Sequence, residues 1–131
     1  MASQSHSLRS ALGKVRGLGS AKEGTHHWWL QRLTALALIP LTIWLVASLI
    51  ALSGFGHEEF VVWFGQPVNA TIMILFLAVA FHHAQLGMQV VIEDYVPHHG
   101  WRMALIILVK FACYGLAVLT IVSILKIAFG A

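Results

Sequence analysis

The 131-residue chain is poor in charged residues and contains a single cysteine. Charged residues make up 10% of the sequence, against roughly a quarter in ordinary soluble domains. The lone Cys113 excludes an internal disulfide, covalent haem attachment through Cys-x-x-Cys-His and a self-contained iron–sulfur site. The sequence also has no alternating strand pattern and no internal repeat. These absences argue against a soluble domain and against a β-sheet fold.

Three long apolar runs account for the 59% hydrophobic content. They cover residues 33–52, 70–92 and about 103–127, and each is near the ~20 residues that a helix needs to cross a bilayer. Because irregular backbone cannot face lipid, each run is expected to be a helix. The sequence therefore predicts an all-α membrane protein with three transmembrane helices, made of an N-terminal arm (1–31) and a three-helix anchor domain (32–131).

Basic residues are concentrated before the first run, and they set the expected orientation. These residues are Arg9, Lys14, Arg16, Lys22 and Arg32. The loop after the first run carries Glu58 and Glu59 but no base, whereas the second loop carries Arg102. The positive-inside rule predicts a cytoplasmic N-terminus and a periplasmic C-terminus. The net charge of +3 thus reflects membrane topology and does not indicate a nucleic-acid partner.

Several polar residues and prolines predict local structure in and between the spans. Pro40 removes a backbone donor and is expected to bend the first helix. Asn69 is expected to cap the second helix, after a short loop flanked by turn residues. Lys110 is expected to extend its ammonium group toward Arg102. Three hydroxyl side chains of the first run are expected to pair with neighbouring helices: Thr34, Thr42 and Ser48.

The most informative segment is residues 81–95, where two histidines interrupt an apolar run. Ionisable groups inside a membrane are costly and are usually functional. At 100° per residue, His83, Gly87, Val90 and Asp94 share one helix stripe. The stripe offers a possible iron ligand, a position without a side chain where a flat ring could approach, and an acidic end. The alternative for His83 is a neutral imidazole that is hydrogen-bonded to another helix.

Asp94 and Tyr95 follow at the end of the same run. A phenol at this depth can donate to a carbonyl oxygen while its ring packs in an apolar slot. A quinone head group needs such a donor together with a nearby proton source. The alternatives are a tyrosine of the interfacial aromatic belt and an aspartate that bonds the helix end.

The spacing His83-Ala84-x-x-Gly87-Met88-x-x-Val91-x-x-Asp94-Tyr95 resembles the signature of the hydrophobic membrane anchor subunit of succinate dehydrogenase, the D-type subunit of respiratory complex II. The opening of the first run, at residues 32–35, and the arm segment at residues 15–22 are similar to those of bacterial anchors of this kind. The resemblance covers most of the chain, and its specific content lies in residues 83–95.

The resemblance implies that His83 is one axial ligand of haem b and that a cytochrome b subunit supplies the other. It implies that Tyr95 hydrogen-bonds ubiquinone with support from Asp94. Arg32 and His26 would lie near the haem propionates. Two histidines stand side by side at 26–27 and again at 82–83. The assignments of His26 and His83 are therefore ambiguous by one residue, and the spacing of the motif favours His83 over His82.

The implied function is electron transfer from succinate to quinone. A flavoprotein subunit and an iron–sulfur subunit would deliver the electrons, and this chain would supply the anchor, a haem ligand and part of the quinone site. The arm resembles retained family sequence, which favours a bacterial inner membrane over the mitochondrial one.

Three other functions fit the same sequence. The chain could anchor a fumarate reductase, which runs the same couple in reverse. It could be a cofactor-free scaffold or assembly protein whose histidines only link helices. A proton relay through His83 and Asp94 in a transporter subunit is the third, although three helices without a repeat argue against a self-sufficient transporter.

The charge asymmetry yields a topology prediction. A reporter enzyme fused after Ala131 should be active on the periplasmic side of the inner membrane, because the basic excess precedes the first span. Matched fusions of a cytoplasm-active and a periplasm-active reporter measure this, and cytoplasmic activity after Ala131 would contradict the orientation.

Overall fold

The computed structural model describes Leu12 and residues 22–130, and this part of the chain is helical without any strand. Its four helices are α2 (Lys22–Leu52), α3 (His57–Gly65), α4 (Pro67–Tyr95) and α5 (His99–Ala128). Three of them, α2, α4 and α5, are long and apolar enough to cross a membrane. The predicted all-α architecture with three candidate transmembrane helices is confirmed.

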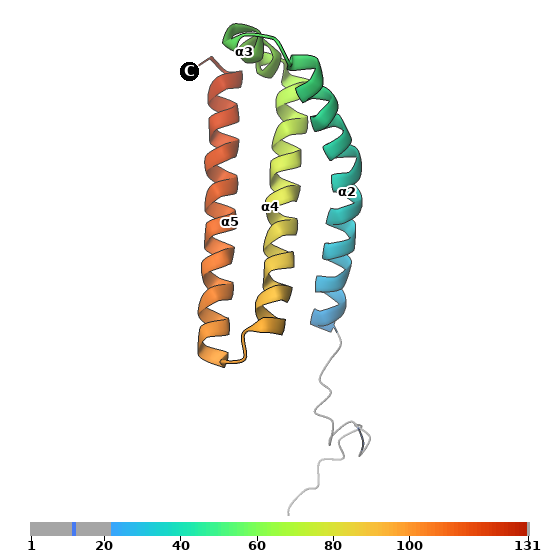
Figure 1. The fold of residues 1–131 in the computed structure, drawn as a ribbon, viewed down its shortest axis with the longest axis vertical. Helices are drawn as coiled ribbons and strands as arrows, with labels where there is room; N and C mark the ends of the chain where they lie inside the picture. The colour runs from blue at the N-terminus through green and yellow to red at the C-terminus, as the bar shows by residue number, and fades with distance from the viewer. Residues whose placement is uncertain (1–11, 13–21, 131) are drawn as a thin grey trace, which may run out of the picture.

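The three long helices run side by side, with α4 between α2 and α5 (Figure 1). The start of α2, the end of α4 and the start of α5 lie at one end of the bundle, called the Tyr95 end below. The short helix α3 lies across the opposite end. The functional candidates at residues 82–95 therefore belong to the half of α4 nearer the Tyr95 end.

Helix α2 includes the last ten residues of the expected N-terminal arm. Residues 22–31 are helical and continuous with the apolar run. Of the rest of the arm only Leu12 is described, so most of the 15–22 segment lies outside the described residues. The helix continues through Pro40 and curves along its length (Figure 1). This curvature is consistent with the bend that a missing proline N–H favours.

The segment expected to be a loop contains helix α3. Its Phe64 is among the best buried residues, at 3% exposed. Trp63 stacks on Trp44 of α2 with ring centroids 5.6 Å apart. The flanking glycine and proline residues of the sequence resemble a loop, but the aromatic residues between them pack onto the long helices. Helix α3 thus closes the end of the bundle opposite Tyr95.

The expected N-cap of the second span is wrong. Helix α4 begins at Pro67, with Gln66 in the N-cap position. Proline suits the first helical position because the amide there has no intrahelical partner. Asn69 lies within the first turn, and its Nδ2 donates to the carbonyl of Trp63 at 3.1 Å. It therefore links α4 to α3.

The interior of the bundle is thin. Only seven side chains are buried among the described residues: Ser48, Phe64, Ala70, Gln85, Leu86, Ile92 and Ala117. Most large apolar side chains are exposed, as suits a protein surrounded by lipid or by other subunits. Ser48 donates to the Trp44 carbonyl of its own helix at 2.7 Å, so its expected bond to a neighbouring helix is not seen.

Gly54 connects α2 to α3 with a φ of +97°, and nothing lies within 4 Å of a Cβ added there. Gly54→Ala should therefore destabilise through backbone strain alone, by about 1–2 kcal/mol. Gly65 is the matched control, because its added Cβ also meets nothing and its φ is not positive. Thermal unfolding in detergent should show a lower midpoint for Gly54→Ala than for Gly65→Ala. Equal midpoints would show that the turn relaxes without cost.

Candidate functional site

The imidazole of His83 contacts α2. Its Nδ1 lies 2.8 Å from the hydroxyl oxygen of Thr34. The ring is half-buried. The expectation that Thr34 pairs with another helix is confirmed, and the partner is the predicted iron ligand. This contact joins α2 to α4 within the membrane-spanning part of both helices.

His82 points toward a different helix. Its Nδ1 lies 3.3 Å from the hydroxyl of Tyr114 on α5, and the two rings are tilted at 38°. This contact joins α4 to α5. Adjacent histidines thus face opposite neighbours, as a rotation of 100° per residue requires for a helix lying between two others.

Gly87 follows His83 by one turn, and few atoms lie near its α-carbon on the outer side of the helix. A Cβ added there would meet only Nε2 of Gln31, at 3.8 Å. The Oε1 of the same Gln31 is buried and has no hydrogen-bond partner in the described part of the chain. Beside His83, therefore, the backbone of Gly87 carries no side chain and the Oε1 of Gln31 lacks a donor within the described residues. A ligand or another subunit could fill this position.

Asp94 and Tyr95 form the last turn of α4 and are both exposed, Tyr95 at 82%. No basic residue lies in that turn. Asp94 follows His83 by eleven residues, or about 16 Å of helix rise. The chain alone leaves the phenol and the carboxylate open to a ligand or to another subunit.

The structure does not bring His26 and Arg32 to one place. Arg32 is exposed, and its guanidinium carbon lies 5.4 Å from the ring centroid of Trp28. His26 instead lines a groove together with His27 and His82. Six residues of helix correspond to a rotation of 600°, so the two side chains stand about 120° apart around α2.

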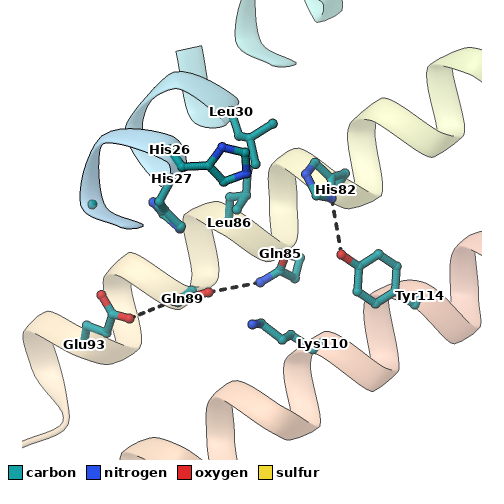
Figure 2. Close-up of a pocket in the computed structure, with 11 residues that line it drawn as sticks. His26, His27, Leu30, His82, Gln85, Leu86, Gln89, Glu93, Lys110 and Tyr114 are labelled. Atoms are coloured by element: carbon teal, nitrogen blue, oxygen red, sulfur yellow. Dashed lines mark hydrogen bonds between the residues drawn. The ribbon is translucent and has the colours of Figure 1, made fainter. Parts of the chain in front are cut away.

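That groove, about 670 Å³ in volume, lies between α2 and α5 over α4. Figure 2 shows the residues that line it. They are His26, His27 and Leu30 on α2, His82, Gln85, Leu86, Gln89 and Glu93 on α4, and Lys110 and Tyr114 on α5, with Gly24 at one edge.

A chain of amide hydrogen bonds forms the floor of the groove (Figure 2). Gln85, only 2% exposed, donates from Nε2 to Oε1 of Gln89 at 3.3 Å. Gln89 in turn donates to Oε1 of Glu93 at 2.8 Å. Lys110 lines the same groove, whereas the expectation placed its ammonium group near Arg102.

Sequence reasoning missed this groove, although the sequence carried a signal. Residues 85, 89 and 93 recur at i, i+4 spacing, as do 110 and 114, and such residues are neighbours on a helix surface. The spacing indicates a polar stripe on each helix. It does not reveal that the two stripes face each other.

The described residues could supply one ligand to a metal that other groups also hold, but they do not form a complete metal site. Among Leu12 and residues 22–130, no three histidine, cysteine or carboxylate side chains are grouped closely enough to hold a lone ion. A site that uses His83 therefore needs ligands from elsewhere. The exposed Asp94–Tyr95 pair likewise offers one donor and one carboxylate but no enclosing wall.

Comparisons with known proteins agree with the fold. Residues 6–122 match the family described as the succinate dehydrogenase/fumarate reductase transmembrane subunit. The succinate dehydrogenase hydrophobic membrane anchor subunit of Rickettsia bellii is 36% identical over 125 residues, which cover 95% of this chain and 96% of that protein. The equivalent subunit of Paracoccus denitrificans is 32% identical over 117 residues, 89% of this chain and 90% of that protein.

The membrane anchor subunit of succinate dehydrogenase from Reclinomonas americana is 30% identical over 92 residues, 68% of this chain and 77% of its own length. The likeness extends far beyond residues 83–95 and confirms the resemblance drawn from them. Together with three apolar helices of spanning length, it makes the chain a multi-pass membrane protein. The chain belongs to the family of succinate dehydrogenase/fumarate reductase transmembrane subunits.

Proposed function

We propose that the chain is the hydrophobic membrane anchor subunit of a succinate:quinone oxidoreductase, in which His83 is one axial ligand of haem b and Tyr95 and Asp94 form part of the ubiquinone-reduction site. The anchor role is supported by the family match and by relatives that are named as anchor subunits of succinate dehydrogenase. These relatives match this chain over most of their own length. The haem and quinone roles are supported by the residues described above.

The observation that carries the haem role is the placement of His83. Its imidazole is half-buried on a spanning helix and is held through Nδ1 by Thr34. The second ring nitrogen is the atom left to meet a ligand. Gly87, one turn along, has no side chain of its own, and a Cβ added there would meet only the amide nitrogen of Gln31, at 3.8 Å. A haem held by His83 could therefore lie close to the backbone of α4.

A second axial ligand has to come from another chain. The described histidines outside the 82–83 pair lie near the starts of α2, α3 and α5, and His82 is turned toward Tyr114. When bound, a haem b with two histidine ligands would supply a one-electron store close to the quinone. In this chain, His83 would hold the iron on one side, and Arg32, which is exposed on α2, would offer positive charge to a propionate.

His26 and Arg32 stand about 120° apart around α2. His26 lines the groove between α2 and α5, whereas Arg32 is exposed beside Trp28. Each offers a donor to a propionate, and they would do so from different faces of the helix.

The quinone role rests on chemistry at the end of α4. Reduction of ubiquinone takes up two electrons and two protons, so the head group has to meet an electron carrier and a route to water. Tyr95 is exposed at the end of the span and can donate to a quinone oxygen, while the neighbouring Asp94 can orient the phenol or pass a proton. The open surface around both residues leaves room for other subunits to complete the wall.

The proposed partners follow from what this chain does not supply, namely the second haem ligand and the electrons from succinate. A cytochrome b subunit would supply the second haem ligand, and the iron–sulfur and flavoprotein subunits would bring electrons from succinate to the Tyr95 end. That end would face the cytoplasm of a bacterium, in agreement with the positive-inside rule. The family description covers fumarate reductase as well. The relatives compared above are named as succinate dehydrogenase subunits, and these names favour succinate oxidation as the direction of the reaction.

One observation favours the alternative of a cofactor-free scaffold. Both histidines of the doublet hydrogen-bond to neighbouring helices within the chain, which is what purely structural histidines would do. The optical spectrum of the purified complex separates the two functions, because a scaffold has no Soret band.

His83→Ala should remove the low-spin haem spectrum of the complex or convert it to a high-spin one, because one of two axial ligands is lost. His82→Ala is the matched control: it removes an identical side chain one residue away and should leave the spectrum largely unchanged. Reduced-minus-oxidised difference spectra and low-temperature EPR of the purified complex measure both variants.

The reverse pattern would move the ligand to His82. Unchanged low-spin spectra in both variants, with all four subunits co-purifying in normal ratio, would show that neither His82 nor His83 is the axial ligand.

Tyr95→Phe should slow ubiquinone reduction by roughly tenfold or more. Losing one hydrogen bond costs ~0.5–1.5 kcal/mol, and about 1.4 kcal/mol corresponds to one decade in rate. The loss is larger if the bond strengthens as charge develops on the quinone oxygen. Succinate oxidation by an artificial dye that accepts electrons upstream should survive.

Tyr114→Phe provides the control for Tyr95→Phe, because it makes the same chemical change on α5, away from the proposed quinone site. It should keep the wild-type rate of quinone reduction. If Tyr95→Phe also keeps that rate with haem and assembly intact, Tyr95 is only an interfacial residue.

A further inference from the structure

Thr34 makes an unusual number of close contacts for one hydroxyl group. Its Oγ1 lies 2.7 Å from the carbonyl oxygen of Leu30 and 3.1 Å from that of Gln31, both on its own helix. It also lies 2.8 Å from Nδ1 of His83 on α4. All three distances are within hydrogen-bond range.

The count of protons decides the direction of these bonds. A threonine hydroxyl carries one proton and two lone pairs. A carbonyl oxygen can only accept, so the two contacts on α2 require the hydroxyl to be the donor there. If the proton pointed at His83 instead, two carbonyl oxygens would face the lone pairs of Oγ1 at close range. The arrangement that satisfies all the atoms is donation from Thr34 to the Leu30 carbonyl and donation from Nδ1–H of His83 to Thr34.

We infer that Thr34 is a positioning residue that fixes His83 as the Nδ1–H tautomer and so presents its Nε2 lone pair for axial ligation of iron. The inference rests on the proposed haem role and goes beyond it. A neutral imidazole carries one ring proton, so a proton held at Nδ1 leaves Nε2 unprotonated. Thr34 also fixes the rotation of the ring, because Nδ1 has to stay in contact with α2.

The contact of His82 lacks this constraint. Its Nδ1 is 3.3 Å from the Tyr114 hydroxyl, a longer contact, and within the described part of the chain that hydroxyl has no second partner that fixes its proton. Tyr114 can therefore donate to His82 or accept from it. Of the two adjacent histidines, only His83 has its tautomer set by the surrounding hydrogen bonds, and this distinction is independent of motif spacing.

A hydrogen bond from Nδ1–H increases the electron density that an imidazole offers to a metal. An axial ligand that donates more electron density stabilises ferric iron relative to ferrous iron. Without the bond, the ferrous state should therefore be easier to reach. Thr34 acts on the iron only through His83, so its contribution should appear in the haem's redox potential and ligand field and not in whether iron is bound at all.

Thr34→Val tests this inference in the whole complex, because valine keeps the shape of threonine without the hydroxyl. We expect the haem to remain low-spin, its midpoint potential to shift upward and its EPR g values to change. Thr34→Ser retains the hydroxyl and should restore the wild-type potential. Optical redox titration and EPR of the ferric state give both quantities without measuring turnover.

Thr120→Val is the matched control. Thr120 makes the same pair of contacts on its own helix, to the carbonyls of Leu116 at 2.8 Å and Ala117 at 3.0 Å, and its hydroxyl contacts no histidine among the described residues. Its replacement should leave the potential and the g values unchanged. A shift in Thr120→Val equal to that in Thr34→Val would assign the effect to helix stability and overturn the inference.

The remaining outcomes separate the inference from the proposed function. If Thr34→Val leaves the potential and g values at wild-type values while His83→Ala abolishes the low-spin haem, the ligand is correct and the role of Thr34 is wrong. If His83→Ala keeps the low-spin haem, the proposed function itself fails. Should valine prevent assembly, Thr34→Ala removes the same hydroxyl in a smaller side chain, and an unchanged potential there is equally contrary to the inference.

Discussion

A polar group inside an apolar span has to find its partner within the protein, because hydrocarbon offers none. This requirement organises α4. The imidazole of His83 meets a hydroxyl of α2, and the imidazole of His82 meets a phenol of α5. The buried amide of Gln85 meets the next glutamine along the helix. Few side chains are buried in this thin bundle, and the two histidine contacts each join α4 to a different neighbour.

The two faces of α4 that result have different characters. One meets α2 through His83 and Thr34 and continues over Gly87 toward the last turn. The other forms the floor of a polar groove whose walls belong to α2 and α5 (Figure 2). A rotation of 100° between adjacent histidines is enough to separate them. The proposed redox surface and the groove therefore share one helix without sharing side chains.

Much of this architecture could be predicted from the sequence, because it depends on properties local to each segment. The lengths of the apolar runs predicted the three spans, and a hydroxyl within the first run predicted the contact of Thr34 with another helix. The prediction failed where contacts between distant segments decide the structure. Trp63 of α3 stacks on Trp44 of α2, and Asn69, which lies inside a helix that already begins at Pro67, bonds the carbonyl of Trp63. The groove depends on stripes of α4 and α5 facing one another, which spacing within one helix cannot reveal.

The direction of the amide chain on α4 has an electrostatic consequence for the end of that helix. The carbonyl end of a helix is its negative pole, yet the last turns of α4 hold Glu93 and Asp94 with no base among them. The amides of Gln85 and Gln89 both point their N–H groups toward Glu93, so two aligned dipoles offset part of the repulsion on that carboxylate. No such alignment serves Asp94, which is exposed. The positive charge at this end of α4 comes instead from Arg102, whose Nε donates to the carbonyl of Val96 at 2.9 Å. The turn between α4 and α5 thus places a cation against the negative pole of the helix.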